Sequence, residues 1–174
     1  MMETTATCHC GKTAIALIGV PIMSNACCCT SCQTANHRFE TMPGAGKVVH
    51  DSGATPYTLM RKDRVRLLRG REYLEPYRLT PNTKTRRVLA TCCNAPMYLD
   101  FKGGHWISVY TDRIPEADRL PVEVYTMAGD LADPSGLAVG IPAPRTHTLK
   151  FMVQLMSAWV AMGFRVPKLG WVKD

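Results

Sequence analysis

The segment Cys27-Cys28-Cys29-Thr30-Ser31-Cys32 holds four of the eight cysteines of this 174-residue chain. Read as Cys-x-Cys-x-x-Cys, it offers the thiols of Cys27, Cys29 and Cys32 within one short stretch. Three protein ligands leave the fourth position of a tetrahedral zinc open, which is the arrangement of catalytic zinc sites. Such a zinc can hold an incoming thiol as a thiolate or polarise a carbonyl oxygen. The segment therefore predicts a catalytic-type zinc site, with the role of Cys28 left open.

Three other interpretations of this segment remain. A fourth protein ligand would close the site and make the zinc structural, or the thiols are buried and bind no metal. The pair Cys29 and Cys32 also has the spacing of a redox motif, but the sequence around it does not predict the strand-helix-strand unit of a thioredoxin.

The other four cysteines form two pairs, Cys8 with Cys10 and Cys92 with Cys93. Cys8-His9-Cys10-Gly11 predicts a tight turn that points two sulfurs the same way, and glycine permits the backbone that follows. The second pair lies at the tip of a predicted hairpin, which can bring sulfur beside the first pair. Together the pairs supply three or four thiols for a structural zinc. The alternative is a set of buried thiols without metal.

Composition and termini restrict the class of protein. A chain that is 46% hydrophobic and 20% charged predicts one globular domain with an extension, and excludes a disordered or fibrous chain. Clustered cysteines argue against a secreted disulfide framework. Residues 1–5 lack the basic and apolar regions of a secretory signal, and no apolar run reaches the ~18 residues that span a membrane. We therefore expect a cytoplasmic protein that makes no membrane contact.

Apolar and alternating runs predict a mainly β fold. The predicted strands cover residues 13–18, 64–67, 73–79, 86–91, 97–101, 106–110 and 122–125, and Pro76 places the third at a sheet edge. We expect a cysteine-rich β domain over residues 1–125 and a C-terminal extension over 126–174.

The extension is predicted to contain one amphipathic helix at about 147–163, between Thr146 as N-cap and Gly163 as C-cap. Its apolar positions are Leu149, Met152, Val153, Met156, Trp159, Val160 and Gly163. We expect this face to pack on the sheet or against a second copy of the chain in a homodimer.

The order of these motifs, over roughly residues 7–110, resembles that of the glutathione-dependent formaldehyde-activating enzyme family. A branch of the same superfamily shares the patterns Cys-x-Cys-x-x-Cys-Gln at residues 27–33 and Ala-x-Cys-Cys-x-x-Pro at 90–96. The resemblance implies the Mss4-like zinc-binding β fold. By position, Cys8, Cys10 and Cys93 match the structural zinc site, and Cys27, Cys29 and Cys32 match the second zinc site. It also implies carbon–sulfur lyase chemistry, the addition of glutathione to a small aldehyde or its reverse.

Two positions depart from the family pattern. The late motif of the family is Cys-x-x-Cys, and aligning Cys93 with its second cysteine puts Ala90, which cannot ligate, at the first. Cys92 would have to substitute, but adjacent strand side chains point to opposite faces. We therefore expect a distorted site, a water ligand or low occupancy. Cys28 stands where better-known members have a polar or aromatic residue.

The whole chain has a net charge of +7, and many of its basic residues gather in two stretches. They are Arg61, Lys62, Arg64, Arg66, Arg69, Arg71, Lys84, Arg86 and Arg87. Arginine suits the carboxylates of glutathione or a similar thiol, although alternating charge is also typical of a solvated strand face. The absence of interleaved aromatic residues disfavours nucleic acid as a partner.

Two functions follow from these patterns. The first is a zinc enzyme that acts on a thiol or a thiol–aldehyde adduct, with His9, His37, His105 or Glu40 as candidates for its general base. The second is a non-enzymatic, zinc-stabilised binding module, including a degenerate family member with incomplete metal sites. An open ligand position that faces a pocket favours the enzyme, and a closed four-sulfur site that uses Cys28 favours the module.

Overall fold

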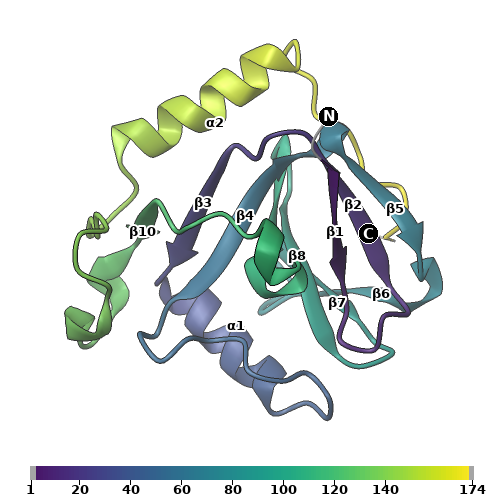
Figure 1. Cartoon of the computed structure of the whole chain (residues 1–174), viewed down its shortest axis with the longest axis horizontal. Helices are drawn as coiled ribbons and strands as arrows, with labels where there is room; N and C mark the ends of the chain where they lie inside the picture. Colours follow the sequence, from purple (N-terminus) through teal and green to yellow (C-terminus); the bar gives the residue numbers. More distant parts are fainter. Residues whose placement is uncertain (1–2, 173–174) are drawn as a thin grey trace.

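The computed structural model describes residues 3–172 and confirms a mainly β fold with a C-terminal helix (Figure 1). The described residues form ten strands in two sheets, and two α-helices. The smaller sheet has the order β1-β2-β5, from Glu3–Thr7, Ala14–Ile18 and Val65–Arg69. The larger sheet has the order β10-β3-β4-β9-β8-β7-β6. Its strands in chain order are β3 (Met23–Cys27), β4 (Thr55–Arg61), β6 (Leu74–Tyr77), β7 (Thr85–Ala90), β8 (Ala95–Phe101), β9 (Trp106–Tyr110) and β10 (Val124–Thr126).

All seven predicted strands are present, and β6 with Pro76 lies at a sheet edge as expected. The sequence did not predict β1, β3, β4 or the helix α1 (Thr30–Glu40). Strand β3 is central and buried on both faces, and two of its buried residues are the polar Ser24 and Asn25. Strand β4 contains Pro56, which argues against a central strand. Neither strand shows the alternation that identifies a half-buried strand.

Two connections position the cysteines. Helix α1 begins directly after β3, so residues 27–32 run from the end of a central strand into the first helical turn. Strands β7 and β8 pair antiparallel, and the turn between them carries Cys92 and Cys93. One hydrophobic cluster, which includes Cys8, Met97 and Ile107, lies beside this turn, and a second, which includes Cys32, Phe39 and Tyr57, lies beneath α1.

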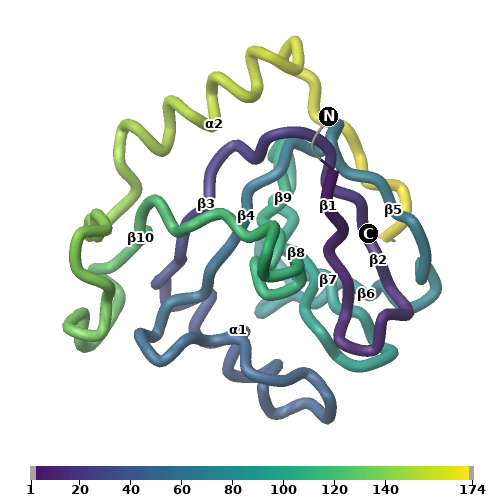
Figure 2. The backbone as a smooth tube through the Cα atoms, viewed as in Figure 1, coloured from purple at the N-terminus to yellow at the C-terminus, as the bar shows by residue number. Residues whose placement is uncertain are grey.

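The C-terminal helix, α2 (Leu149–Ala161), is shorter than predicted and has Thr148 rather than Thr146 as its N-cap. It lies along the outside of the molecule, at the top of Figure 1, after a loop that Figure 2 traces outward from β10. Its buried residues are Phe151 and Leu155, one turn apart, which join the cluster beneath α1.

The prediction that the other apolar face of α2 packs on the sheet is wrong. That face is exposed: Leu149 is 80% exposed, and Met152, Val153, Met156 and Val160 are 50–53% exposed. Because α2 is apolar on nearly all sides, periodicity could not identify the side that faces the core. Homodimer contact through this face stays a prediction. Within residues 3–172, no helix combines the length and the apolar character that a membrane crossing requires.

Candidate metal centres

The thiols of Cys27, Cys29 and Cys32 come together in the structure, with all three sulfur atoms within 4.8 Å of one another. Cys27 ends β3, Cys29 is the N-cap of α1, and Cys32 lies in the first helical turn. The Cys29 sulfur accepts a hydrogen bond from the backbone N–H of Cys32 at 3.4 Å. A helix N-terminus favours negative charge, but hydrogen bonds with the other two thiols, together with burial, raise the pKa of Cys27 well above its usual value. Although its hydrogen bond with Cys27 lowers it, the pKa of Cys29 is also raised, by Cys32 and by burial.

Cys28 does not belong to this group. Its side chain is fully buried in a separate cluster with Ala26, Ala54 and Tyr125. Its backbone N–H donates to the carbonyl of Thr126 at 2.9 Å, on the parallel strand β10. The strand geometry therefore turns Cys28 away from its two neighbours, and the group offers three sulfurs to a metal ion.

Hydrogen-bond donors surround the Cys32 sulfur. The Tyr57 hydroxyl donates to it at 3.6 Å and itself accepts a bond from Asn36 at 3.2 Å. The amide oxygen of Asn36 accepts from Tyr110 at 2.7 Å. Asn36 also donates to the Thr55 hydroxyl at 2.9 Å. The bonds from Tyr110 through Asn36 and Tyr57 all run toward the sulfur, which favours a thiolate there. The thiols of Cys27 and Cys29, together with nearby Arg87, hold the pKa of Cys32 well below its usual value, although burial opposes them.

Arg87 is a buried cation beside this group. It is 1% exposed, and its Nη2 lies 4.0 Å from the Cys32 sulfur and donates to Ser31. Its Nε and Nη1 have no hydrogen-bond partner, and no carboxylate within residues 3–172 forms an ion pair with it. Three thiolates around a divalent ion leave a net charge of −1, which a single arginine balances. The sequence offered no signal that Arg87 would be buried here.

The second group contains Cys8, Cys10, Cys92 and Cys93, whose sulfur atoms all lie within 4.8 Å of one another. The Cys10 sulfur is 3.4 Å from that of Cys92 and 3.6 Å from that of Cys8. The backbone N–H of Lys12 and the neighbouring thiols lower the pKa of Cys10 to about 7. Four convergent thiols are the ligand set of a closed structural site.

Cys92, which the sequence offered as a possible fourth ligand, lies in this group, although strand alternation would have turned it away. Cys92 and Cys93 lie in the turn after β7, not in a strand, and the turn includes Asn94 with a left-handed φ of 54°. A turn frees adjacent side chains from strand alternation. Ala90, which stands in the position of the family's cysteine, is buried in β7. The four-thiol group is therefore complete without a ligand at Ala90.

A buried arginine also accompanies the four-thiol group. Arg113 is 6% exposed, and its Nε and Nη1 have no hydrogen-bond partner. Burial lowers the pKa of its guanidinium, while Asp112 and the thiols of Cys93 and Cys8 act in the opposite direction. Each cysteine group thus has one buried, incompletely hydrogen-bonded cation near it.

A cavity of about 310 Å³ opens beside the three-thiol group, with Cys27 and Cys32 in its lining. One wall comes from the large sheet, and α2 supplies another through Phe151, Met152 and Leu155. Apolar side chains dominate, and no aspartate, glutamate, lysine or arginine of the described residues belongs to the lining, which also includes Tyr57 and His147. The remaining lining residues are Asn25, Leu59, Thr85, Leu99, Phe101, Trp106, Ser108 and Thr126. The three-thiol group therefore faces a pocket.

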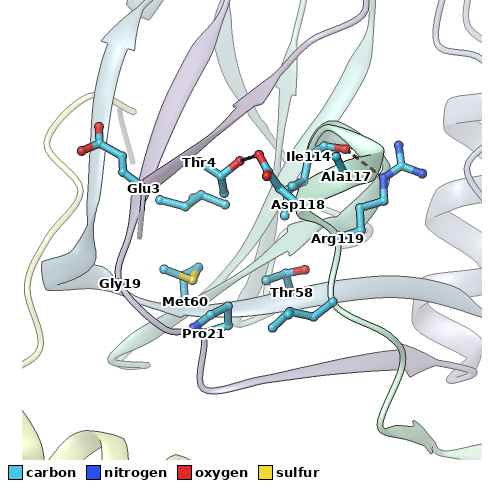
Figure 3. A pocket seen from close by; sticks show the side chains of 12 residues that line it. Glu3, Thr4, Gly19, Pro21, Thr58, Met60, Ile114, Ala117, Asp118 and Arg119 are labelled. Atoms are coloured by element: carbon cyan, nitrogen blue, oxygen red, sulfur yellow. Dashed lines mark hydrogen bonds between the residues drawn. The ribbon is translucent and has the colours of Figure 1, made fainter. Parts of the chain in front are cut away.

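A different cavity of about 200 Å³ lies between β1 and the segment near Asp118 (Figure 3). The Thr4 hydroxyl donates to Asp118 at 2.6 Å across it. No cysteine or histidine of the described chain lines this cavity. It is separate from both cysteine groups.

The basic residues that the sequence associated with an anionic ligand do not line the cavity beside the cysteines. Most of them have partners within the fold. The ion pairs are Arg61 with Asp63, Lys62 and Arg86 with Asp100, and Arg66 with Glu3. Arg69 and Arg71 donate to the backbone carbonyls of Gly11 and Gly170. These contacts tie strands and loops together.

The four general-base candidates also lie elsewhere. His105 is buried with Nε2 at 2.9 Å from the Leu155 carbonyl, and Nδ1 of His9 lies 3.0 Å from the Gly44 carbonyl. Glu40 accepts from the backbone N–H groups of Val48 and Val49, each at 2.7 Å. His37 lies beside Glu40 on the exposed side of α1. His147, which the sequence did not single out, lines the cavity and stacks on Phe151 from the position just before the N-cap Thr148.

No family model matches this chain, and no curated protein matches it. Among solved structures, the chain is similar to the crystal structure of a Rhodobacter sphaeroides protein, a Northeast Structural Genomics target. The two are 17% identical with a TM-score of 0.48, and the match covers 72% of this chain and 100% of the other. A likeness at this level carries no argument about function, so membership of the formaldehyde-activating family stays a prediction.

Proposed function

We propose that this chain is a zinc-dependent enzyme that forms or breaks a carbon–sulfur bond between a thiol and a small aldehyde. One observation carries the proposal. The thiols of Cys27 and Cys32 line a cavity, while Cys28, the sulfur that could have closed the site, faces a different cluster. This arrangement supports an open ligand position over a closed structural site.

The donor set supports zinc as the metal. Groups of three or four thiolates are typical ligands of Zn²⁺ and of iron–sulfur clusters. The orphaned nitrogens of buried Arg87 support a net negative charge at the three-thiol group. Zinc bound there would lower the pKa of an incoming thiol and hold it as a thiolate.

The residues around the cavity would supply the rest of the chemistry. In the addition, the thiol sulfur bonds to the carbonyl carbon, and the proton from the thiol ends on the carbonyl oxygen. His147, which lines the cavity, is the group that we assign to carry this proton. The apolar walls, including Leu99 and Phe151, would exclude water that competes with the thiol for the aldehyde.

Zinc stoichiometry tests the first part of this proposal. We expect two zinc ions per chain in the wild type and one in the Cys27→Ser variant, as measured by elemental analysis. A wild-type protein without zinc, or a variant that keeps both ions, would overturn the two-site arrangement. We further expect His147→Gln to lower turnover while thiol affinity stays unchanged.

A zinc-stabilised binding module is the second candidate function. The exposed apolar face of α2, which includes Val153 and Met156, favours it because such faces mark interaction surfaces. The two functions can be distinguished by whether an added thiol reaches the metal. In a cobalt-substituted protein, an added thiol would change the absorption spectrum of an open site, whereas the spectrum of a closed site would stay constant.

A further inference from the structure

Outside its metal-binding thiols, the cavity beside Cys27 and Cys32 has no side chain with a permanent charge. None of the described residues that line it is an aspartate, glutamate, lysine or arginine. Leu59, Leu99 and Trp106 form much of its sheet wall. A carboxylate that enters this cavity loses its water, gains no lysine or arginine partner and meets the net charge of −1 that three thiolates leave on a divalent ion, which is unfavourable.

Arginines near the cavity cannot change this result. The Nη2 atom of Arg87 lies 4.0 Å from the Cys32 sulfur, but Arg87 is 1% exposed and does not belong to the lining. Arg61 and Arg86 pair with Asp63 and Asp100. Glutathione carries two carboxylates and an ammonium group, so most of its polar groups would lie unpaired in this cavity.

Asn25 adds one specific polar contact point. It is 4% exposed on the central strand β3 and lines the cavity. Its amide nitrogen donates to the Thr126 hydroxyl at 3.1 Å, but its amide oxygen is buried without a partner. A buried acceptor of this kind is rare in native proteins and suits a ligand that brings a hydrogen-bond donor.

We propose that the cavity selects an uncharged, apolar thiol rather than glutathione, and that Asn25 accepts a hydrogen bond from the hydroxyl of the thiol–aldehyde adduct. The proposal rests on the proposed function, since it concerns the same three-thiol site. The adduct is a hemithioacetal, in which the former carbonyl oxygen has become a hydroxyl group. An apolar substituent on the sulfur would lie against Leu99, Trp106 and Phe151, and the hydroxyl would reach the unpaired amide oxygen of Asn25.

Calorimetric titration of the zinc-loaded protein with phenylmethanethiol and with glutathione tests the selection. We expect phenylmethanethiol to bind at least tenfold more tightly. Equal or tighter binding of glutathione would overturn this inference and leave the proposed function standing. If neither thiol binds, the proposed open metal site itself is wrong.

A charge placed in the lining sharpens this test. Leu99→Lys should weaken the binding of phenylmethanethiol at least tenfold. It should also reduce the preference of the protein for phenylmethanethiol over glutathione. The matched control is Leu68→Lys on β5, which changes an exposed leucine outside the lining and should leave both affinities unchanged. An unchanged preference in Leu99→Lys would overturn the role of the uncharged wall.

A separate titration tests Asn25, with phenylmethanethiol alone and after equilibration with formaldehyde, which supplies the hydroxymethyl adduct. The free thiol can bind zinc as a thiolate and the adduct cannot, so each ligand is compared between the two proteins. Asn25→Leu, which keeps the side-chain size, should bind the adduct about tenfold more weakly than the wild type, as the loss of one buried hydrogen bond allows, and keep the affinity for the free thiol. Equal affinity of both proteins for the adduct would overturn the assignment of Asn25.

Discussion

Replacing Arg87 with methionine tests whether the three-thiol group is a charged metal centre. The Nη2 atom lies 4.0 Å from the Cys32 sulfur, a distance at which two unit charges attract by about 4 kcal/mol in an effective dielectric of 20. Both charges are delocalised, so an effective separation of about 6 Å, worth about 3 kcal/mol, is more realistic. We therefore expect Arg87→Met to weaken the binding of zinc at this site about a hundredfold.

The metal-free protein should depend less on Arg87. There the arginine faces the thiolate of Cys32 alone, and its Nε and Nη1 still lack partners, so its replacement by an apolar side chain removes part of the cost of burying a charge. Competition with a chromophoric chelator measures zinc affinity, and thermal unfolding of the metal-free protein measures stability. Arg87→Lys keeps the charge and should retain most of the affinity. Unchanged affinity in Arg87→Met, or an equal loss in Arg87→Lys, would refute the role of the charge.

Three more predictions concern other parts of the fold. Arg113→Met should weaken the binding of zinc at the four-thiol group and leave that at the three-thiol group unchanged. Chelator competition in the Cys27→Ser background measures the affinity of the four-thiol group. Cys28→Ala should keep two zinc ions and Cys32→Ala should keep one, because only Cys32 belongs to a thiol group. Although burial opposes it, backbone N–H groups of Val49 and Val48 hold the pKa of Glu40 below its usual value. Glu40→Gln should therefore lose about 2 kcal/mol of stability at pH 7. This loss should shrink as the pH falls below about 4 and wild-type Glu40 takes up its proton. Urea unfolding at pH 7 and pH 3 checks this, with the exposed Glu75→Gln as control.

The three-thiol group could be predicted from sequence because its spacing is local. Cys27, Cys29 and Cys32 fall within six positions, so the end of a strand and one helical turn suffice to bring them together. Helix α1 itself went unrecognised, although its buried residues Cys32, Ala35, Asn36 and Phe39 follow helical spacing. A single large apolar side chain in that stripe gives too weak a signal.

The surroundings of the site could not be predicted, because they depend on distant strands. The basic run at residues 84–87 contains two very different arginines. Arg86 pairs with Asp100, whereas Arg87 faces the thiols from the opposite side of the same strand. Asn25 and His147 reach the cavity from segments more than a hundred residues apart. The local sequence around a single polar residue does not indicate whether its side chain will line a cavity.

The two thiol groups differ in the length of chain between their members. Cys8 and Cys92 are 84 positions apart, and a metal that joins them closes a long loop. By analogy with a disulfide across a loop of that length, the link would raise the free energy of the unfolded chain by about 4–5 kcal/mol at room temperature, because it lowers the entropy of that chain. The three-thiol group spans one turn of backbone that β3 and α1 already order, so a metal there contributes little to loop closure. Loss of metal from the four-thiol group would therefore destabilise the whole fold. The three-thiol group, in contrast, can gain or exchange a ligand while the protein stays folded.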